Sequence, residues 1–284
     1  MVSVWHRGKA KVDCLLGNKL PRRLTTCESA CRFPCEIVEM ITAHLTHDLR
    51  ALKACSLTCQ LWYLVVVPLL HHTLILRGDG PSAAHSKLKP LFKLYELGLI
   101  PLVKEIRVGQ WCGKGRWFGP QAFSRRDLRY FSTFTNVQTL VLERLRLDHF
   151  IPDIKRYFAH FSPSLKSIAL FKPRCTPRQL SYFLSLFPNL DDIEIQHTYT
   201  SKPNATLPDA ELVLSSAPIM RGRLVLHCFR WIETWTYLTA SCGGPRFRYV
   251  DLRGSACCAP LLLEACAETI ETLRFNVTDG FFGK

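Results

Sequence analysis

The sequence lacks any apolar run long enough to cross a membrane. Its longest apolar stretch is Leu61–Leu70, which Pro68 interrupts, whereas a membrane-spanning helix needs about 20 apolar residues. The first residues, MVSVWHRGKAKVDC, are too charged to form the apolar core of a secretory signal. We therefore expect an intracellular protein, in the cytoplasm, the nucleus or both, without membrane association.

Recognised catalytic motifs are missing as well. No nucleophile stands in a known catalytic setting, and the glycine-rich stretch 113–119 (GKGRWFG) has neither the Walker spacing nor the dinucleotide-binding spacing. We expect no enzyme activity and no cofactor. Trp111 and Trp117 lie among basic residues, an arrangement that suits stacking on single-stranded nucleic acid. The alternative is an ordinary surface loop.

Acidic residues are scarce relative to basic ones. The chain has 23 Asp and Glu against 37 Lys and Arg, for a formal net charge of +14. Such a charge attracts nucleic acid, anionic lipid or acidic proteins. Residues 1–32 are especially basic, and we expect a poorly ordered, solvated tail. A mitochondrial transit peptide has a similar composition but carries an amphipathic stripe, which this tail lacks.

The 13 cysteines do not form a disulfide pattern, because they are odd in number, widely spread and mostly placed inside apolar patterns. Without a secretion signal, we expect reduced thiols that pack as small apolar side chains. Cys27, Cys31 and Cys35 are the strongest candidate metal ligands. Zinc sites favour paired cysteines with a second pair, which Cys55 and Cys59 could supply. Since Cys35 and Cys55 also fall within a helical pattern, we expect no metal.

Residues 33–76 predict three short helices. Pro34 suits the first turn of a helix, and Ile37, Met40, Ile41, His44 and Leu45 follow with helical spacing. Asp48 can cap a second helix, and a third helix is expected to end near Pro68. Forty-odd residues bury too little surface to be robust alone, so these helices are expected to need a partner.

A second pattern recurs from about residue 98 onward. It reads Pro-x-Leu-x-x-Ile-x-Leu or a close variant, and its strand-like x-Leu-x-Leu core turns two apolar residues to one side. The first of these residues in each copy are Ile106, Leu140, Ile168, Ile193, Leu224, Val250 and Leu273. Their spacing averages about 28 residues, within the roughly 20–29 residues of leucine-rich repeats.

Helical stretches are predicted between these strands. Thr176-Pro-Arg-Gln179 has the form of a capping box with proline at the first helical position. Leu180, Phe183, Leu184 and Phe187 then follow at helical spacing, and a similar stripe spans residues 154–161. The sequence thus predicts an α/β fold in which parallel strands carry helices outside them, as in an irregular solenoid. An ordinary α/β domain with βαβ units is the alternative.

The helical segment resembles the F-box, particularly the version common in mushroom-forming fungi. The resemblance rests on FPCEIVEMITAHL at 33–45 and on DLRALKACSLTCQLW at 48–62. It covers residues 33–76, which leaves 1–32 as the tail, 77–97 as a linker and 98–284 as a degenerate leucine-rich-repeat array. Phe33 replaces the usual leucine, and Gln60 stands where a basic residue often precedes the tryptophan.

The resemblance implies a function without catalysis. F-box proteins dock a Skp-type adaptor, which connects to a cullin scaffold, and their second domain presents a target protein for ubiquitin transfer. The chain would then be the substrate receptor of an SCF-type ubiquitin ligase. By the family pattern, the docking surface comprises Phe33, Pro34, Ile37, Val38, Ile41, Leu45, Leu52, Leu57 and Trp62. The alternative makes these residues the private core of a small helical domain.

In a solenoid, the strand residues that flank the apolar anchors face the concave surface. Acidic residues gather there on the middle strands, and basic residues at the ends. The candidate residues for binding an unknown protein substrate are Arg107, Asp192, Glu194, Tyr249, Asp251 and Arg274. A solvated face is the alternative.

Two further hypotheses remain open. The net charge of +14 and the tryptophan-bearing loop are compatible with a nucleic-acid-binding or general protein-binding solenoid without a ligase role. The chain also stops nine residues after Phe275 without a polar capping repeat, so a truncated array with an exposed apolar end is expected.

Overall fold

The computed structural model describes residues 33–77, 89–109, 133–144, 147, 158–161, 163–200, 220–227, 245–254 and 259–276. The chain divides into two compact units. The first unit comprises residues 1–74 and 90–104, and the second comprises residues 75–89 and 105–284. The predicted basic tail, the loop at 113–119, and Cys27 and Cys31 lie outside the described residues.

The first unit contains the three predicted helices, which are α2 (Cys35–His44), α3 (Leu49–Cys55) and α4 (Gln60–Leu70). Helix α4 packs against both α2 and α3. The Asp48 carboxylate caps α3 as predicted, because it accepts the backbone N–H groups of Arg50 and Ala51 at 2.9 and 3.0 Å. The buried side chains of these helices are few and mostly small, and they are Val38, Thr42, Leu52, Ser56, Cys59, Val66 and Val67.

The structure differs from the sequence prediction at three places near this module. Helix α4 continues past the exposed Pro68 to Leu70. Residues Thr73–Arg77 form a strand, β1, and Lys89–Glu96 within the expected linker form helix α6. A 3-10 turn, η3 (Ile100–Leu102), follows. The segment between the helical module and the next strand is therefore more structured than its composition indicated.

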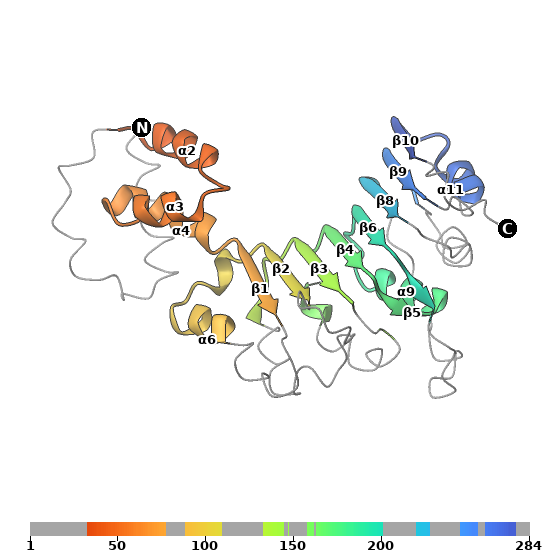
Figure 1. Ribbon diagram of the computed structural model, residues 1–284, viewed down its shortest axis with the longest axis horizontal. Helices are drawn as coiled ribbons and strands as arrows, with labels where there is room; N and C mark the ends of the chain where they lie inside the picture. The colour runs from red at the N-terminus through yellow and green to blue at the C-terminus, as the bar shows by residue number, and fades with distance from the viewer. Residues whose placement is uncertain are drawn as a thin grey trace. The chain divides into compact units, whose positions relative to one another are not determined.

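An eight-stranded sheet forms the centre of the second unit, with its strands in chain order (Figure 1). After β1, the strands are β2 (Glu105–Gly109), β3 (Thr139–Glu143), β4 (Ser167–Phe171), β6 (Asp192–Gln196), β8 (Arg223–His227), β9 (Tyr249–Arg253) and β10 (Thr272–Asn276). Strands β2 to β10 pair in parallel throughout. A separate parallel pair joins β5 (Arg174–Cys175) to β7 (Tyr199–Thr200).

The apolar anchors of successive strands lie in register. The predicted anchors Ile106, Leu140, Ile168, Ile193, Leu224, Val250 and Leu273 form one continuous row across the sheet. A second row consists of Val108, Leu142, Leu170, Ile195, Leu226, Leu252 and Phe275. All are buried except the two on β10. The prediction of an α/β fold with a parallel sheet is thus confirmed.

Helix α9 (Pro177–Ser185) begins with the capping box that the sequence predicted. Gln179 N–H donates to the Thr176 hydroxyl at 3.2 Å, and Thr176 N–H donates to the Gln179 side-chain carbonyl at 2.9 Å. The apolar stripe of this helix is fully buried, and it consists of Leu180, Phe183, Leu184 and Phe187. Two of its rings, Phe183 and Phe187, pack edge to face at 5.3 Å, and Phe158 packs edge to face on Phe183 at 6.2 Å.

A left-handed residue follows directly after four of the strands. These residues are Arg144 (φ 55°), Lys172 (φ 54°), His197 (φ 52°) and Gly254 (φ 83°). Each donates its N–H to the last carbonyl of the next strand in the sheet, at 2.7 to 3.0 Å. The same turn thus recurs at the same place, and it ties each strand end to its neighbour.

Replacing Lys172 tests this turn, because only glycine adopts a positive φ without a steric cost. We expect Lys172→Val to lower the free energy of unfolding by about 1–2 kcal/mol, since a β-branched residue is strained there. Lys172→Gly should leave stability unchanged or raise it. Urea unfolding of both variants checks this, and equal losses for valine and glycine would show that the lysine side chain, not the backbone, is responsible.

Candidate functional site

Helix α2 has two apolar faces, and only one of them is buried. Val38 and Thr42, which are four residues apart, point into the core of the module. Ile37, Met40 and Ile41 lie on a different side of the helix and are 38%, 61% and 39% exposed. Phe33, two residues before the helix, is 58% exposed. We call Phe33, Ile37, Met40 and Ile41 the α2 apolar face.

The structure separates the predicted docking residues into three groups. Phe33, Pro34, Ile37, Ile41 and Leu57 are exposed, Leu45 and Trp62 are half-buried, and Val38 and Leu52 are fully buried in the core. Met40 and Leu49, which the family pattern did not assign, are also largely exposed. The module therefore exposes more large apolar side chains than it buries, an arrangement typical of a contact surface.

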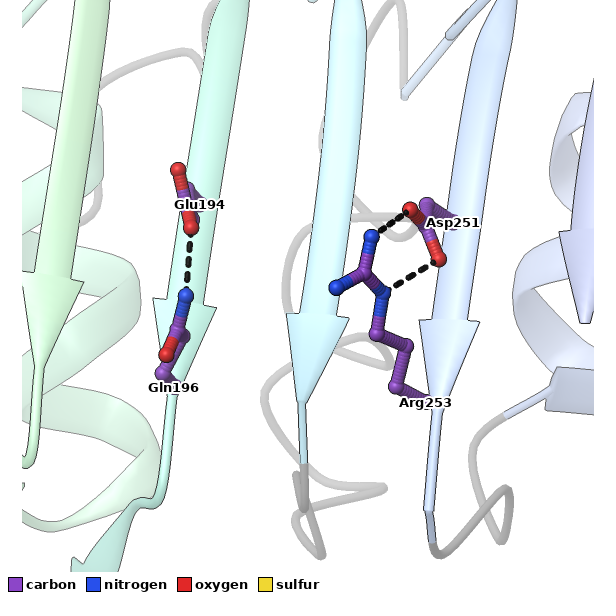
Figure 2. Close-up of polar contacts among 4 residues, drawn as sticks. All are labelled: Glu194, Gln196, Asp251 and Arg253. Atoms are coloured by element: carbon purple, nitrogen blue, oxygen red, sulfur yellow. Dashed lines mark hydrogen bonds and ion pairs between the residues drawn. The ribbon is translucent and has the colours of Figure 1, made fainter. Parts of the chain in front are cut away.

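The second unit has a polar sheet face opposite the buried anchors. Its central row has one residue from each strand from β2 to β10, and three of them are apolar: Arg107, Val141, Ala169, Glu194, Val225, Asp251 and Arg274. Arg107 forms an ion pair with Glu105 of its own strand at 2.6 Å. Glu194 accepts a hydrogen bond from the Gln196 amide on β6 (Figure 2). These two predicted substrate residues are therefore already partnered within their strands.

Asp192, one of the predicted substrate-binding residues, instead links two strands of the sheet. Its carboxylate accepts the backbone N–H of Arg223 at 2.7 Å and so joins the start of β6 to the start of β8. Gly222 lets this happen, because a Cβ there would lie 2.2 Å from the same carboxylate oxygen and 3.1 Å from the Asp191 carbonyl. Asp192 therefore has a structural role, which depends on the close approach of the two chain segments at Gly222.

The remaining predicted residues gather on β9 and β10. Asp251 is only 1% exposed, and its carboxylate accepts two hydrogen bonds from the Arg253 guanidinium at 2.7 and 3.0 Å (Figure 2). These hydrogen bonds lower the pKa of the Asp251 carboxyl; the charges of Arg253, Arg274 and Arg223 act in the same direction, and burial opposes them. The Asp251 carboxylate is therefore held in place by Arg253, which also balances its negative charge.

Tyr249 lies beneath two arginines from neighbouring strands. The guanidinium carbons of Arg223 and Arg274 lie 5.3 and 5.5 Å from the centre of its ring, within the range of a cation–π contact. Neither arginine forms an ion pair with a carboxylate of the residues that the structure describes. We call Arg223, Tyr249, Asp251, Arg253 and Arg274 the β8–β10 cluster.

The candidate binding residues from the sequence did not include Arg223 and Arg253. Arg253 stands two residues after Asp251, so strand alternation places both on one face. That spacing could have identified the pair. The closeness of Arg223 to Tyr249 depends on which strand adjoins β9 and in which register, which no local pattern reveals.

The described residues contain neither a cluster of metal ligands nor a membrane-spanning helix. Among them, no three His, Cys, Asp or Glu side chains lie close enough to hold a metal ion. The pKa of the Cys35 thiol is raised, first by burial and then by Glu39, which disfavours the thiolate that binds metals. The described helices are also too short or too polar to traverse a bilayer.

No protein-family model matches the chain, and none of the curated proteins matches it.

Replacing Gly222 tests the contact between β6 and β8. We expect Gly222→Ala to lower the free energy of unfolding by about 1–3 kcal/mol, because the added methyl group displaces the Asp192 carboxylate from the Arg223 N–H. Asp192→Ala should cost a similar amount, and the two changes combined should cost less than their sum. Full additivity in chemical unfolding would contradict this account.

Asp251 predicts a specific pH dependence of stability. Its folded pKa is lowered, so its contribution is complete well above the usual value of 3.8 and is lost as pH falls through the folded pKa. We expect Asp251→Asn to cost about 1–3 kcal/mol at neutral pH. The difference from wild type should shrink as the pH falls below about 4 in urea unfolding.

Glu271→Gln provides the matched control. Glu271 forms its ion pair with Arg248 at 3.7 Å, and both side chains are about two-thirds exposed. An exposed pair contributes little to stability, so this change should leave the unfolding curve unaltered at both pH values. If the cost of Asp251→Asn were the same at all pH values, the carboxylate charge would not be the stabilising feature.

Proposed function

We propose that the chain is a non-catalytic receptor of the F-box type. Residues 33–76 would dock a Skp-type adaptor, and through it a cullin scaffold, while the sheet-bearing unit would hold a target protein for ubiquitin transfer. The α2 apolar face carries this proposal, because three of its four residues occupy positions of the F-box pattern. The proposal places the protein in the cytoplasm, the nucleus or both.

The energetics of the helical module support a bound partner. Ile37, Met40 and Ile41 each expose more than a third of their surface, and burying such side chains contributes roughly 1.5–3 kcal/mol each when complete. The fully buried residues of the three helices are few and mostly small. A partner protein would complete a core that the module begins but does not finish.

Three features of the second unit support a repeat solenoid as the target-binding part. The strands follow chain order without the reversal typical of doubly wound sheets. The anchors of seven strands are in register. The same left-handed turn recurs after four strands. Each feature is expected when one structural unit is repeated and stacked.

The proposed mechanism is proximity. A receptor that binds adaptor and target together raises the local concentration of the target near the transfer machinery. The encounter between donor and acceptor then becomes effectively intramolecular. No residue of this chain needs to act as acid, base or nucleophile in such a process.

Co-purification with a Skp-type adaptor tests the proposal. We expect the Ile37→Asp, Ile41→Asp double variant to lose adaptor binding by more than about ten-fold, since two charges would enter an apolar contact. Both positions are exposed, so the fold should persist by circular dichroism. Titration of the purified adaptor by calorimetry gives the affinity.

Leu261→Asp is the matched control for this experiment. Leu261 is 41% exposed, which is close to the exposure of Ile37 and Ile41, but it lies on α11 (Ala259–Cys266). The same chemical change there should leave adaptor binding intact. Equal adaptor binding by wild type and the α2 double variant would remove the proposed function.

A nucleic-acid-binding role is the second candidate, supported by the net charge of +14. It predicts affinity for DNA or RNA that falls steeply as salt increases, because phosphate contacts release counterions. Binding of a Skp-type adaptor that is sensitive to the α2 apolar face would instead favour the receptor.

A further inference from the structure

Among the strands that the structure describes, β10 lies at the edge of the sheet (Figure 1). Leu273 is 47% exposed and Phe275 is 52% exposed. Their register partners on β9, Val250 and Leu252, are 0% and 4% exposed. The two anchor rows of the sheet therefore continue to its edge, where a further strand with apolar residues in these rows would cover Leu273 and Phe275.

The backbone of β10 is also paired on one side only. The Thr272 N–H donates to the backbone carbonyl of Arg248 at 2.9 Å, and the Asn276 carbonyl accepts the Gly254 N–H at 3.0 Å. Both groups therefore face β9. Successive residues of a strand direct their N–H and C=O groups to opposite sides. The groups of Leu273 and Phe275 therefore point to the free edge, and no hydrogen bond joins that edge to another described strand.

The charge of Arg274 indicates which kind of side chain would bind at the β10 edge. Arg274 lies between the two anchors, on the polar sheet face, in register with Asp251 of β9. Asp251 is already held by both bonds from Arg253. Arg274 stacks on Tyr249, and its charge acts on Asp251, but it has no ion pair within 4 Å in the described part of the chain. An acidic side chain in the same row of an added strand would match its charge.

We propose that the β10 edge binds an extended segment of a partner protein with an apolar–acidic–apolar pattern. The segment adds a parallel strand to the sheet, its backbone pairs with Leu273 and Phe275, and its acidic residue lies beside Arg274. This inference rests on the proposed receptor function for its biological role, and it names the class of target segment that the second unit holds.

A second copy of this chain fits the edge less well. Pairing two β10 strands through their centres would place Arg274 directly opposite Arg274, and like charges at that position are destabilising. A polynucleotide could neutralise Arg274 but cannot pair with the strand backbone or cover Leu273 and Phe275. The combination of an open backbone edge, two apolar side chains and one unpaired cation therefore favours a polypeptide.

Fluorescence anisotropy with the full-length chain and labelled peptides tests the proposal. The first peptide carries a central glutamate flanked by leucines, and the second replaces that glutamate with lysine. We expect the glutamate peptide to bind about ten-fold more tightly at low salt. Arg274→Glu should reverse the preference, whereas Arg246→Glu, which changes an exposed arginine outside β10, should leave it unchanged.

Backbone methylation of the peptide distinguishes strand addition from simple charge attraction. In one version the alternate nitrogens that face β10 are methylated, and in the other version those that face away. We expect the first version to lose binding and the second to retain it. Equal binding of both methylated versions, or of the glutamate and lysine peptides, would overturn the proposal.

Two remaining outcomes also decide against this inference. One is the absence of peptide binding. The other is a concentration-dependent dimer, seen by sedimentation velocity, that persists in Arg274→Glu and excludes the peptide. Because the peptide assay contains no adaptor, either result leaves adaptor docking through the α2 apolar face untouched. Conversely, peptide binding by a chain that fails to bind an adaptor would retain the edge site without the receptor role.

Discussion

The register between adjacent parallel strands is the constraint on which the second unit depends. Because side chains alternate along a strand, a shift of one residue between two strands would exchange the anchor rows with the polar row. Asp251 and Arg274 would then replace Val250 and Leu273 in the row that packs against the interior. The observed pairing of Leu273 with Val250 and of Phe275 with Leu252 excludes such a shift and so fixes which residues lie on the polar face.

Local patterns in the sequence were sufficient to predict the anchors, the Asp48 cap and the capping box of α9. Each of these depends on residues close together in the chain, whose spacing matches a helical or strand period. The turns at Arg144, Lys172 and His197 were not predicted, because non-glycine residues rarely adopt a positive φ. Each turn residue is held in that conformation because its N–H donates to a carbonyl of the next strand. These partners lie more than 20 residues away in the chain, so the local sequence does not reveal them.

Helical spacing grouped Ile37, Met40 and Ile41 on one face of α2, but it did not show that this face is the exposed one. Ile37 and Val38 are both apolar and adjacent, and the family pattern assigns both to docking. Only the packing of α4 against α2 decides that Val38 faces inward and Ile37 outward. The strand at Thr73–Arg77 was not predicted either, because it spans the boundary between the expected helical module and the expected linker.

The order of strands has a consequence for how the second unit forms. Every strand lies beside the strand that precedes it in the chain, so each addition closes a loop of similar length, about 28 residues on average. The entropic cost of closing a loop depends on its own length rather than on the length of the whole chain. The entropic cost of adding a strand is therefore similar at each step. The contacts between strands stay local in the chain however many strands the sheet has, so the contact order stays low.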